Sequence, residues 1–192
     1  DSVIHSFGTA GTGGFGIKGD SVASYSPYLQ WVIAIFMFLF GINFNIYYLL
    51  LVRRFRSVLK STETWCYIAI CLISVAIITG NIYSIYGNLP DSVRASAFQV
   101  ASLVTTTGFS TADFNLWPGL SKGILLILMF IGGCAGSTAG GLKVSRVVMM
   151  IKMIRREFMK MIHPRSVSAV RIEGKKVDDT TLNGVNVYFA LY

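Results

Sequence analysis

Long stretches without a charged residue limit the folds open to this chain more than any other feature. Ser21–Val52 and Thr64–Pro90 contain no Asp, Glu, Lys or Arg, and Gly123–Leu142 is a third such stretch of twenty residues. A helix needs about 20 apolar residues to cross the hydrocarbon core of a bilayer. The composition agrees, with 53% hydrophobic and 14% charged residues and a mean hydropathy of +0.60. We therefore expect an all-α membrane protein.

The basic residues gather in two segments. Of the 17 Lys and Arg residues, four lie between positions 53 and 60 and ten lie between positions 143 and 176. Short cytoplasmic loops of membrane proteins carry such an excess of positive charge. We therefore expect both segments on the cytoplasmic side. Contact with anionic lipid headgroups accounts for the net charge of +8, so no nucleic acid is expected as a partner.

A short polar run, Thr105–Ser110, lies within an uncharged segment, Ala95–Ala112, that is too short to cross a bilayer and return. Non-helical backbone at membrane depth is tolerated where it is buried in protein or lines water. Carbonyl and hydroxyl oxygens of such a run can replace the hydration shell of a cation. We expect an ion-selective loop here, following a short helix over Ser92–Val104 whose negative C-terminal end also favours a cation.

The same pattern occurs a second time, 94 positions earlier in the chain. At that offset four residues within fourteen positions are identical, and Ser2, Thr12, Gly14 and Phe15 match Ser96, Thr106, Gly108 and Phe109. An apolar run follows each copy. We interpret the two copies as an internal repeat that consists of a re-entrant loop and membrane helices, with the first loop over His5–Gly16.

Three membrane crossings are predicted around these loops. Tyr28–Val52 is long enough to cross at 1.5 Å per residue, and Trp65–Tyr86 is long enough to return. Asn43 and Asn45 lie in the inner half of the first crossing and predict an interhelical hydrogen bond or, as the alternative, pore lining. The third crossing, Gly119–Phe158, has forty residues, about twice the required number.

Ten consecutive small residues, Gly132–Gly141, interrupt this third crossing, and five of them are glycine. One interpretation is close helix packing through small residues. The other, which we favour, is an unwound intramembrane loop across the water path, because each glycine disfavours a helix by about 1 kcal/mol relative to alanine. Lys143 follows directly and either raises an electrostatic barrier or extends its amine to cytosolic water, the second being the simpler expectation.

These motifs together resemble the TrkH/KtrB family of potassium uptake proteins. The resemblance is carried by Thr12–Phe15, Thr106–Phe109, Gly132–Lys143 and Met161–Arg165, and it points to the TrkH branch. It implies a pore made from four repeats of helix, pore loop and helix. Residues 1–62 would be the end of one repeat, residues 63–160 a complete repeat, and residues 161–192 a cytosolic connection and the start of the next. The chain would then be part of a longer protein.

The resemblance also implies roles for particular residues. The selectivity filter would consist of Thr12, Gly13, Gly14, Thr106, Thr107 and Gly108, with the transported potassium ion bound at Thr12, Gly13, Thr106 and Thr107. The gating loop would include Gly132, Gly133, Gly136, Ser137, Thr138, Gly140, Gly141 and Lys143. A homodimer in the bacterial inner membrane is implied, with lipid and a cytosolic nucleotide-binding regulatory subunit as partners and no covalently bound cofactor.

Two other function classes compete with potassium transport. A secondary transporter for another solute would use the broken third crossing as its binding site. Such sites usually place a half-helix N-terminus or a basic residue at the midplane, and the three apolar spans contain no charged residue. An enzyme would need a nucleophile with a base or a metal cluster, and His5 and His163 lie at opposite ends without partners. We expect no enzymatic activity. Because Ser110 stands where potassium channels have a second glycine and the two copies differ, we expect weak discrimination against sodium.

Overall fold

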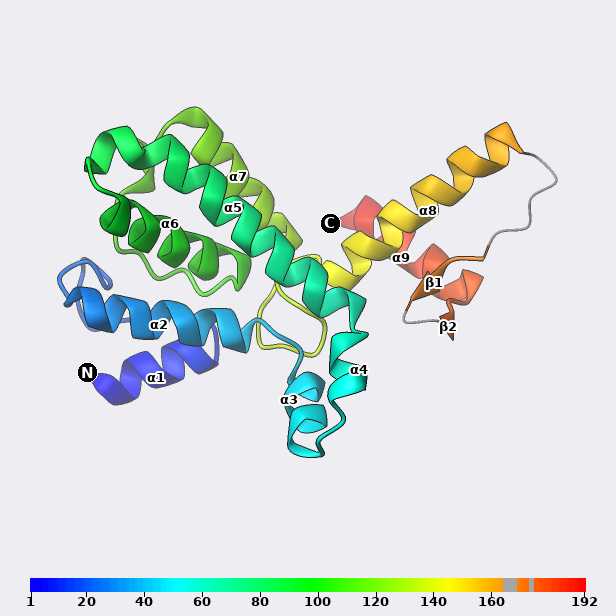
Figure 1. The fold of residues 1–192 in the computed structure, drawn as a ribbon, viewed down its shortest axis with the longest axis horizontal. Coiled ribbons are helices and arrows are strands. Elements are labelled where there is room, and N and C mark those ends of the chain that lie inside the picture. Colours follow the sequence, from blue (N-terminus) through cyan, green and yellow to red (C-terminus); the bar gives the residue numbers. More distant parts are fainter. Residues whose placement is uncertain (164–168, 173–174) are drawn as a thin grey trace.

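The structure, a computed structural model, describes residues 1–163, 169–172 and 175–192 (Figure 1). Within these residues the elements are α1 (Ser2–Ala10), α2 (Pro27–Phe40), α3 (Phe44–Leu51), α4 (Phe55–Leu59), α5 (Thr62–Tyr86), α6 (Leu89–Val104), the 3-10 helix η1 (Phe114–Leu116), α7 (Gly119–Ile131), α8 (Val144–Ile162), β1 (Arg171–Ile172), β2 (Lys175–Lys176) and α9 (Asp179–Leu191). The predicted helical architecture is confirmed. The antiparallel pair β1–β2 was not predicted, and Pro164 and Arg165 of the family-like run lie outside the described residues.

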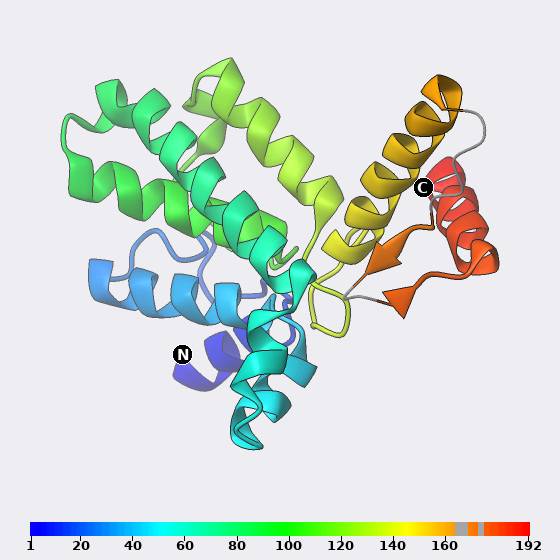
Figure 2. The same cartoon turned by 45° about the vertical axis from the view of Figure 1, so that its right-hand side comes forward.

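Among the residues that the structure describes, α5 is the one helix long and apolar enough to cross a membrane unbroken, with a mean hydropathy of 2.1 over its most apolar stretch. Its outer side chains are large, apolar and exposed, and they include Trp65, Leu72, Ile73, Ile77 and Ile85. A contiguous apolar surface of this kind is suited to lipid contact. Helix α6 lies between α5 and α2, with α7 alongside (Figures 1 and 2), so this central helix packs against all three.

The prediction of one continuous helix over Tyr28–Val52 is wrong, because α2 and α3 meet at an angle of 89°. The chain breaks at Gly41, where an added Cβ atom would lie 2.2 Å from the hydroxyl oxygen of Tyr67. Asn43 then begins α3, since its side-chain oxygen accepts a hydrogen bond from the Asn45 amide at 2.9 Å. Asn43 therefore serves as a helix N-cap instead of making the interhelical hydrogen bond that we expected.

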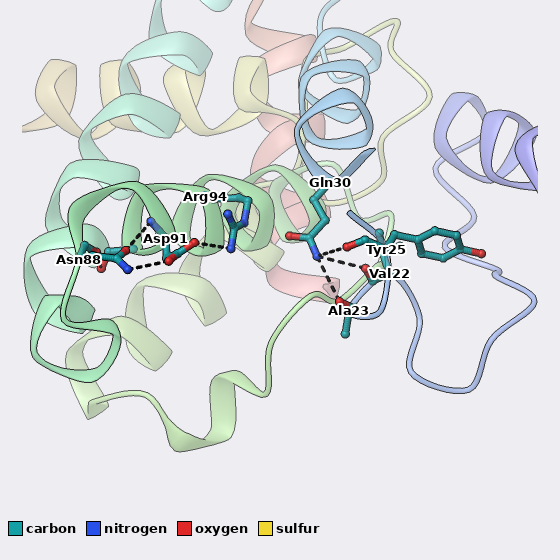
Figure 3. A network of polar contacts seen from close by, with 8 residues as sticks. Val22, Ala23, Tyr25, Gln30, Asn88, Asp91 and Arg94 are labelled. Carbon is teal, nitrogen blue, oxygen red and sulfur yellow. Dashed lines mark hydrogen bonds and ion pairs between the residues drawn. The ribbon is translucent and has the colours of Figure 1, made fainter. Parts of the chain in front are cut away.

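Helices α1 and α6 both end directly before a Thr/Gly bend. The loop expected from His5 onward begins only after Ala10, because Ser2–Ala10 is helical. Helix α6 begins before the expected Ser92. It starts at Leu89, and its N-cap residue, Asn88, accepts a hydrogen bond from the Asp91 amide at 3.0 Å (Figure 3). The Asn88 side chain also donates to the Asp91 carboxylate at 2.7 Å, which together with Arg94 holds the pKa of Asp91 below its usual range.

The interruption predicted in the third crossing is present. Gly132–Lys143 is unwound between α7 and α8, so these two helices are separate. Helix α8 packs against the β1–β2 hairpin and α9, with Met153, Val170 and Leu182 in a small core. The Arg156 guanidinium lies 3.2 Å from the Asp179 carboxylate and joins α8 to the start of α9. These elements form the yellow-to-red part that stands beside the rest of the chain in Figure 2.

Candidate functional site

Two Thr/Gly bends have the same backbone geometry; residues 12–14 are the first bend and residues 106–108 the second. Thr12 and Thr106 have φ angles of 49° and 56°, and Gly14 and Gly108 have φ angles of 68° and 88°. Positive φ is uncommon for residues other than glycine and costs about 1–2 kcal/mol. Because the same unfavourable conformation recurs at the same offset of 94 residues, the sequence identities at the two bends reflect a shared local structure.

The two bends are also closed by equivalent hydrogen bonds. In each bend the amide of the middle residue donates to a carbonyl of the preceding helix. The Gly13 amide donates to the Gly8 carbonyl at 2.8 Å, and the Thr107 amide donates to the Ser102 carbonyl at 2.9 Å. The C-terminal ends of α1 and α6 thus lie against the bends. The partial negative charge at the C-terminal end of a helix favours a cation nearby.

The bends lie in direct contact, although they are far apart in sequence. A Cβ atom on Gly14 would lie 1.9 Å from the carbonyl oxygen of Thr107, so only glycine fits between the two bends. Two hydrogen bonds join the chain segments that follow the two bends. Ser110 donates its amide to the Ser21 hydroxyl at 3.1 Å, and its carbonyl accepts from the Val22 amide at 3.0 Å. The structure therefore brings both sets of predicted filter residues together.

Buried polar side chains hold the segments beyond the bends, and the sequence analysis missed them. The Ser102 hydroxyl donates to the Phe109 carbonyl at 2.5 Å, and the Gln99 amide donates to the Ser110 hydroxyl at 3.3 Å. Gln30 supports the other segment through the carbonyls of Val22, Ala23 and Tyr25 (Figure 3). The sequence did contain a signal for this buried polar face, because polar residues three or four positions apart share one face of a helix. The fully buried polar residues on that face of α6 are Ser92, Ser96, Gln99 and Ser102.

The threonine hydroxyls of both bends contact the small-residue loop, which we define as Gly132–Lys143. Thr12 donates its hydroxyl to the carbonyls of Gly11 at 2.8 Å and Thr138 at 2.9 Å. Thr106 accepts a hydrogen bond from the Gly140 amide at 2.7 Å. The predicted filter and the predicted gating loop are therefore neighbours, and one threonine from each bend makes the contact. The Thr107 hydroxyl instead pairs with that of Thr105 at 2.7 Å, behind the second bend.

Glycines close the small-residue loop at its two ends. Gly132 and Gly141 have φ angles of 76° and 81°, which side chains rarely adopt. They lie back to back, and a Cβ atom on Gly132 would approach the Gly140 carbonyl oxygen to 2.2 Å. The Leu142 amide donates to the Phe130 carbonyl at 2.9 Å across the same point. The loop therefore leaves α7 and returns to α8 through one narrow neck.

Two charged side chains bind the small-residue loop. The expectation that Lys143 extends to cytosolic water is wrong, because its half-buried amine folds back and donates to the Ala139 carbonyl. Glu63, which the sequence analysis missed, accepts hydrogen bonds from the amides of Ala135 at 2.6 Å and Ser145 at 3.2 Å. The only signal in the sequence was an acidic residue directly before an uncharged span.

Comparisons with known proteins show what this chain is similar to. The family model described as TrkH, cation transport protein, matches residues 1–192. The Trk system potassium uptake protein TrkH of Salmonella typhimurium is 35% identical over 196 residues, which covers 100% of this chain and 41% of the relative. The TrkH protein of Escherichia coli K12 is 33% identical with the same coverage. The crystal structure of the potassium transporter TrkH from Vibrio parahaemolyticus matches with a TM-score of 0.89 at 28% identity, covering 99% of this chain and 42% of that one. The chain thus spans about two fifths of the length of these relatives.

Proposed function

The chain belongs to the TrkH family of cation transport proteins, and on this basis we propose that it carries two ion-binding bends of a potassium-conducting pore in a bacterial inner membrane. The observation that supports this most strongly is the contact between two bends of equal geometry, each at the end of a helix. No covalent chemistry is part of the proposal.

Carbonyl oxygens of Thr12, Gly13, Thr106 and Thr107 are the proposed potassium ligands. The hydroxyls of Thr12, Thr106 and Thr107 already make hydrogen bonds, which leaves backbone carbonyls as the better candidates. A ring of such carbonyls replaces the water that the ion loses on entering. Gly14 and Gly108 complete the proposed filter, because their positive φ angles turn the backbone at each bend.

The small-residue loop is the proposed gate. Its middle part reaches both bends through Thr12 and Thr106, and the loop must leave these threonines to open. A neutral hydrogen bond contributes about 0.5–1.5 kcal/mol net. Two such bonds give a closed state that a regulatory partner can shift by binding the open state more tightly. Lys143 belongs to this loop in the closed state through its bond to Ala139.

The alternative of a secondary transporter for another solute gains no support from the broken crossing. That mechanism uses the free N-terminal amides of a half-helix to bind an anionic group. Helix α8 follows the break, and its Ser145 amide already donates to Glu63. The position that a solute carboxylate would occupy is therefore taken by a carboxylate of the chain itself.

The partners are proposed from the relatives, which are named as potassium uptake proteins of the Trk system. We propose a homodimer, a cytosolic nucleotide-binding regulatory subunit and membrane lipid around the apolar face of α5. The repeat boundaries, with residues 1–62, 63–160 and 161–192 as separate units, form part of the same proposal.

Ion flux into lipid vesicles tests the proposed function. The protein as its gene encodes it is reconstituted together with its proposed regulatory subunit, and the uptake of potassium and of sodium is measured against vesicles without protein. We expect potassium uptake above the empty-vesicle level, and a smaller but measurable sodium uptake because the two bends differ in sequence. Absence of potassium uptake would contradict the function. Complete exclusion of sodium would contradict only the expected weak discrimination.

A further inference from the structure

Glu63 joins the two ends of the small-residue loop through one carboxylate oxygen. The Ala135 amide near the beginning of the loop and the Ser145 amide just after it both donate to Oε1, at 2.6 Å and 3.2 Å. Glu63 lies in the first turn of α5, the long membrane helix, and is half-buried. The carboxylate also lies at the N-terminal end of α8, where a negative charge is favoured. Hydrogen bonds to a charged acceptor are stronger than neutral ones.

The first part of the loop is fixed by backbone hydrogen bonds to the break between α2 and α3. The Cys134 amide donates to the Gly41 carbonyl at 2.9 Å, and the Phe44 amide donates to the Gly136 carbonyl at 3.0 Å. The Val144 amide donates to Gly133 at 2.9 Å, which closes the neck from the other side. We call residues 132–136 the base of the loop. Together with Glu63 these bonds attach the base to three separate helices.

The second part of the loop, residues 137–140, is attached differently. Its contacts with the bends pass through the side chains of Thr12 and Thr106, which can rotate away without moving any helix. Thr138 and Gly140 are exposed and Ala139 is buried, whereas Cys134 in the base is completely buried. The Thr138 hydroxyl also donates to the Phe40 carbonyl, at the longer distance of 3.4 Å. We call residues 137–140 the tip. The tip can therefore leave the bends while the base stays in place.

We infer that Glu63 is a positioning residue that anchors the base of the loop, so that opening moves the tip alone. This inference rests on the proposed gating role of the loop. Glu63 contacts no proposed ion site and acts only through the loop. Without its carboxylate, the Ala135 amide loses its acceptor and the Ser145 amide loses its cap, so the base opens as well. Replacement by glutamine keeps an oxygen at the same place and should retain most of the function.

The buried thiol of Cys134 reports whether the base opens. The rate at which a buried thiol is modified follows the fraction of time it is exposed. Cys71, in the core of α5 with 3% of its surface exposed, provides an internal reference within the same protein. The half-buried Cys66 is removed by Cys66→Ser in the full-length parent and in every variant. The rates of labelling of Cys134 and Cys71 by a membrane-permeant maleimide are then compared between the parent and the variants.

The expected result distinguishes anchoring from general destabilisation. In Glu63→Ala, labelling of Cys134 should rise at least about tenfold, as expected if the charge-assisted hydrogen bond from the Ala135 amide of the base is lost. Labelling of Cys71 should stay unchanged, and Glu63→Gln should stay within about threefold of the parent. Glu157→Ala, which removes an exposed carboxylate from α8, is the control and should match the parent.

Two outcomes would overturn the inference. If the two thiols of Glu63→Ala become reactive together, Glu63 supports the whole fold and not the loop. If neither rate changes, the carboxylate does not hold the base. Because labelling does not depend on ion flux, a failure of the proposed potassium transport would leave these rates as expected, and a failure of the anchor would leave potassium uptake by the parent protein intact.

Discussion

Replacing Gly14 with alanine is expected to abolish potassium uptake. The new Cβ atom would lie 1.9 Å from the carbonyl oxygen and 2.9 Å from the carbonyl carbon of Thr107, and both are backbone atoms of the neighbouring bend. Neither can rotate away. The φ angle of 68° adds strain for any residue with a side chain. Strain and overpacking each cost about 1–3 kcal/mol, so the two bends cannot both keep their geometry.

Two further glycines make this prediction quantitative. Gly108 has a φ angle of 88° but open space where a Cβ would lie, so Gly108→Ala should show only the strain of about 1 kcal/mol and a partial loss of uptake. Gly19 is exposed with nothing within 4 Å, so Gly19→Ala should match the parent. Uptake of radioactive rubidium is measured per amount of protein in the membrane. Normal uptake by Gly14→Ala would show that the two bends do not form the ion path.

The second large effect is expected at Gly132, and it has the opposite sign. A Cβ atom there would lie 2.2 Å from the Gly140 carbonyl oxygen and 2.8 Å from the Gly141 Cα atom, so alanine cannot fit in the neck of the closed loop. An overpacking cost of about 2 kcal/mol in the closed state would lower the ratio of closed to open loops about thirtyfold. We therefore expect Gly132→Ala to leak potassium when its regulatory partner is absent.

A glycine in the preceding helix serves as the control for this leak. Gly123 of α7 has nothing within 4 Å of the position of a Cβ atom, so Gly123→Ala should keep the low basal flux of the parent. Flux is measured in vesicles without the regulatory subunit and divided by the amount of reconstituted protein. Equal basal flux through the Gly132→Ala and Gly123→Ala variants would mean that the small-residue loop does not close the pore.

The helices and the position of the loop break could be predicted from the sequence, because both depend on local composition. Apolar spans without charge indicate α5, and the glycine-rich run stops α7 where continuing the helix is unfavourable. The break between α2 and α3 was missed for the opposite reason. Gly41 is a single glycine in an apolar run, and the group whose close approach requires glycine there, the Tyr67 hydroxyl, comes from a different helix.

The site was predicted in its parts but not in its contacts. Identity at the two bends predicted a shared geometry, since the residues of each bend set their own φ angles. That Thr12 and Thr106 reach the loop depends on how two distant segments pack. Glu63 was missed because a lone acidic residue beside a membrane span usually indicates only the helix end. Its role depends on two amides that lie 72 and 82 positions away along the chain.

The location of bound cations tests the central claim most directly. Crystals of the protein as its gene encodes it, grown with rubidium or thallium in place of potassium, would show these ions by anomalous scattering. We expect anomalous density at the level of the Thr12, Gly13, Thr106 and Thr107 carbonyls. Ions bound elsewhere along a continuous passage, with none at these carbonyls, would contradict the assignment of the two bends as the potassium filter.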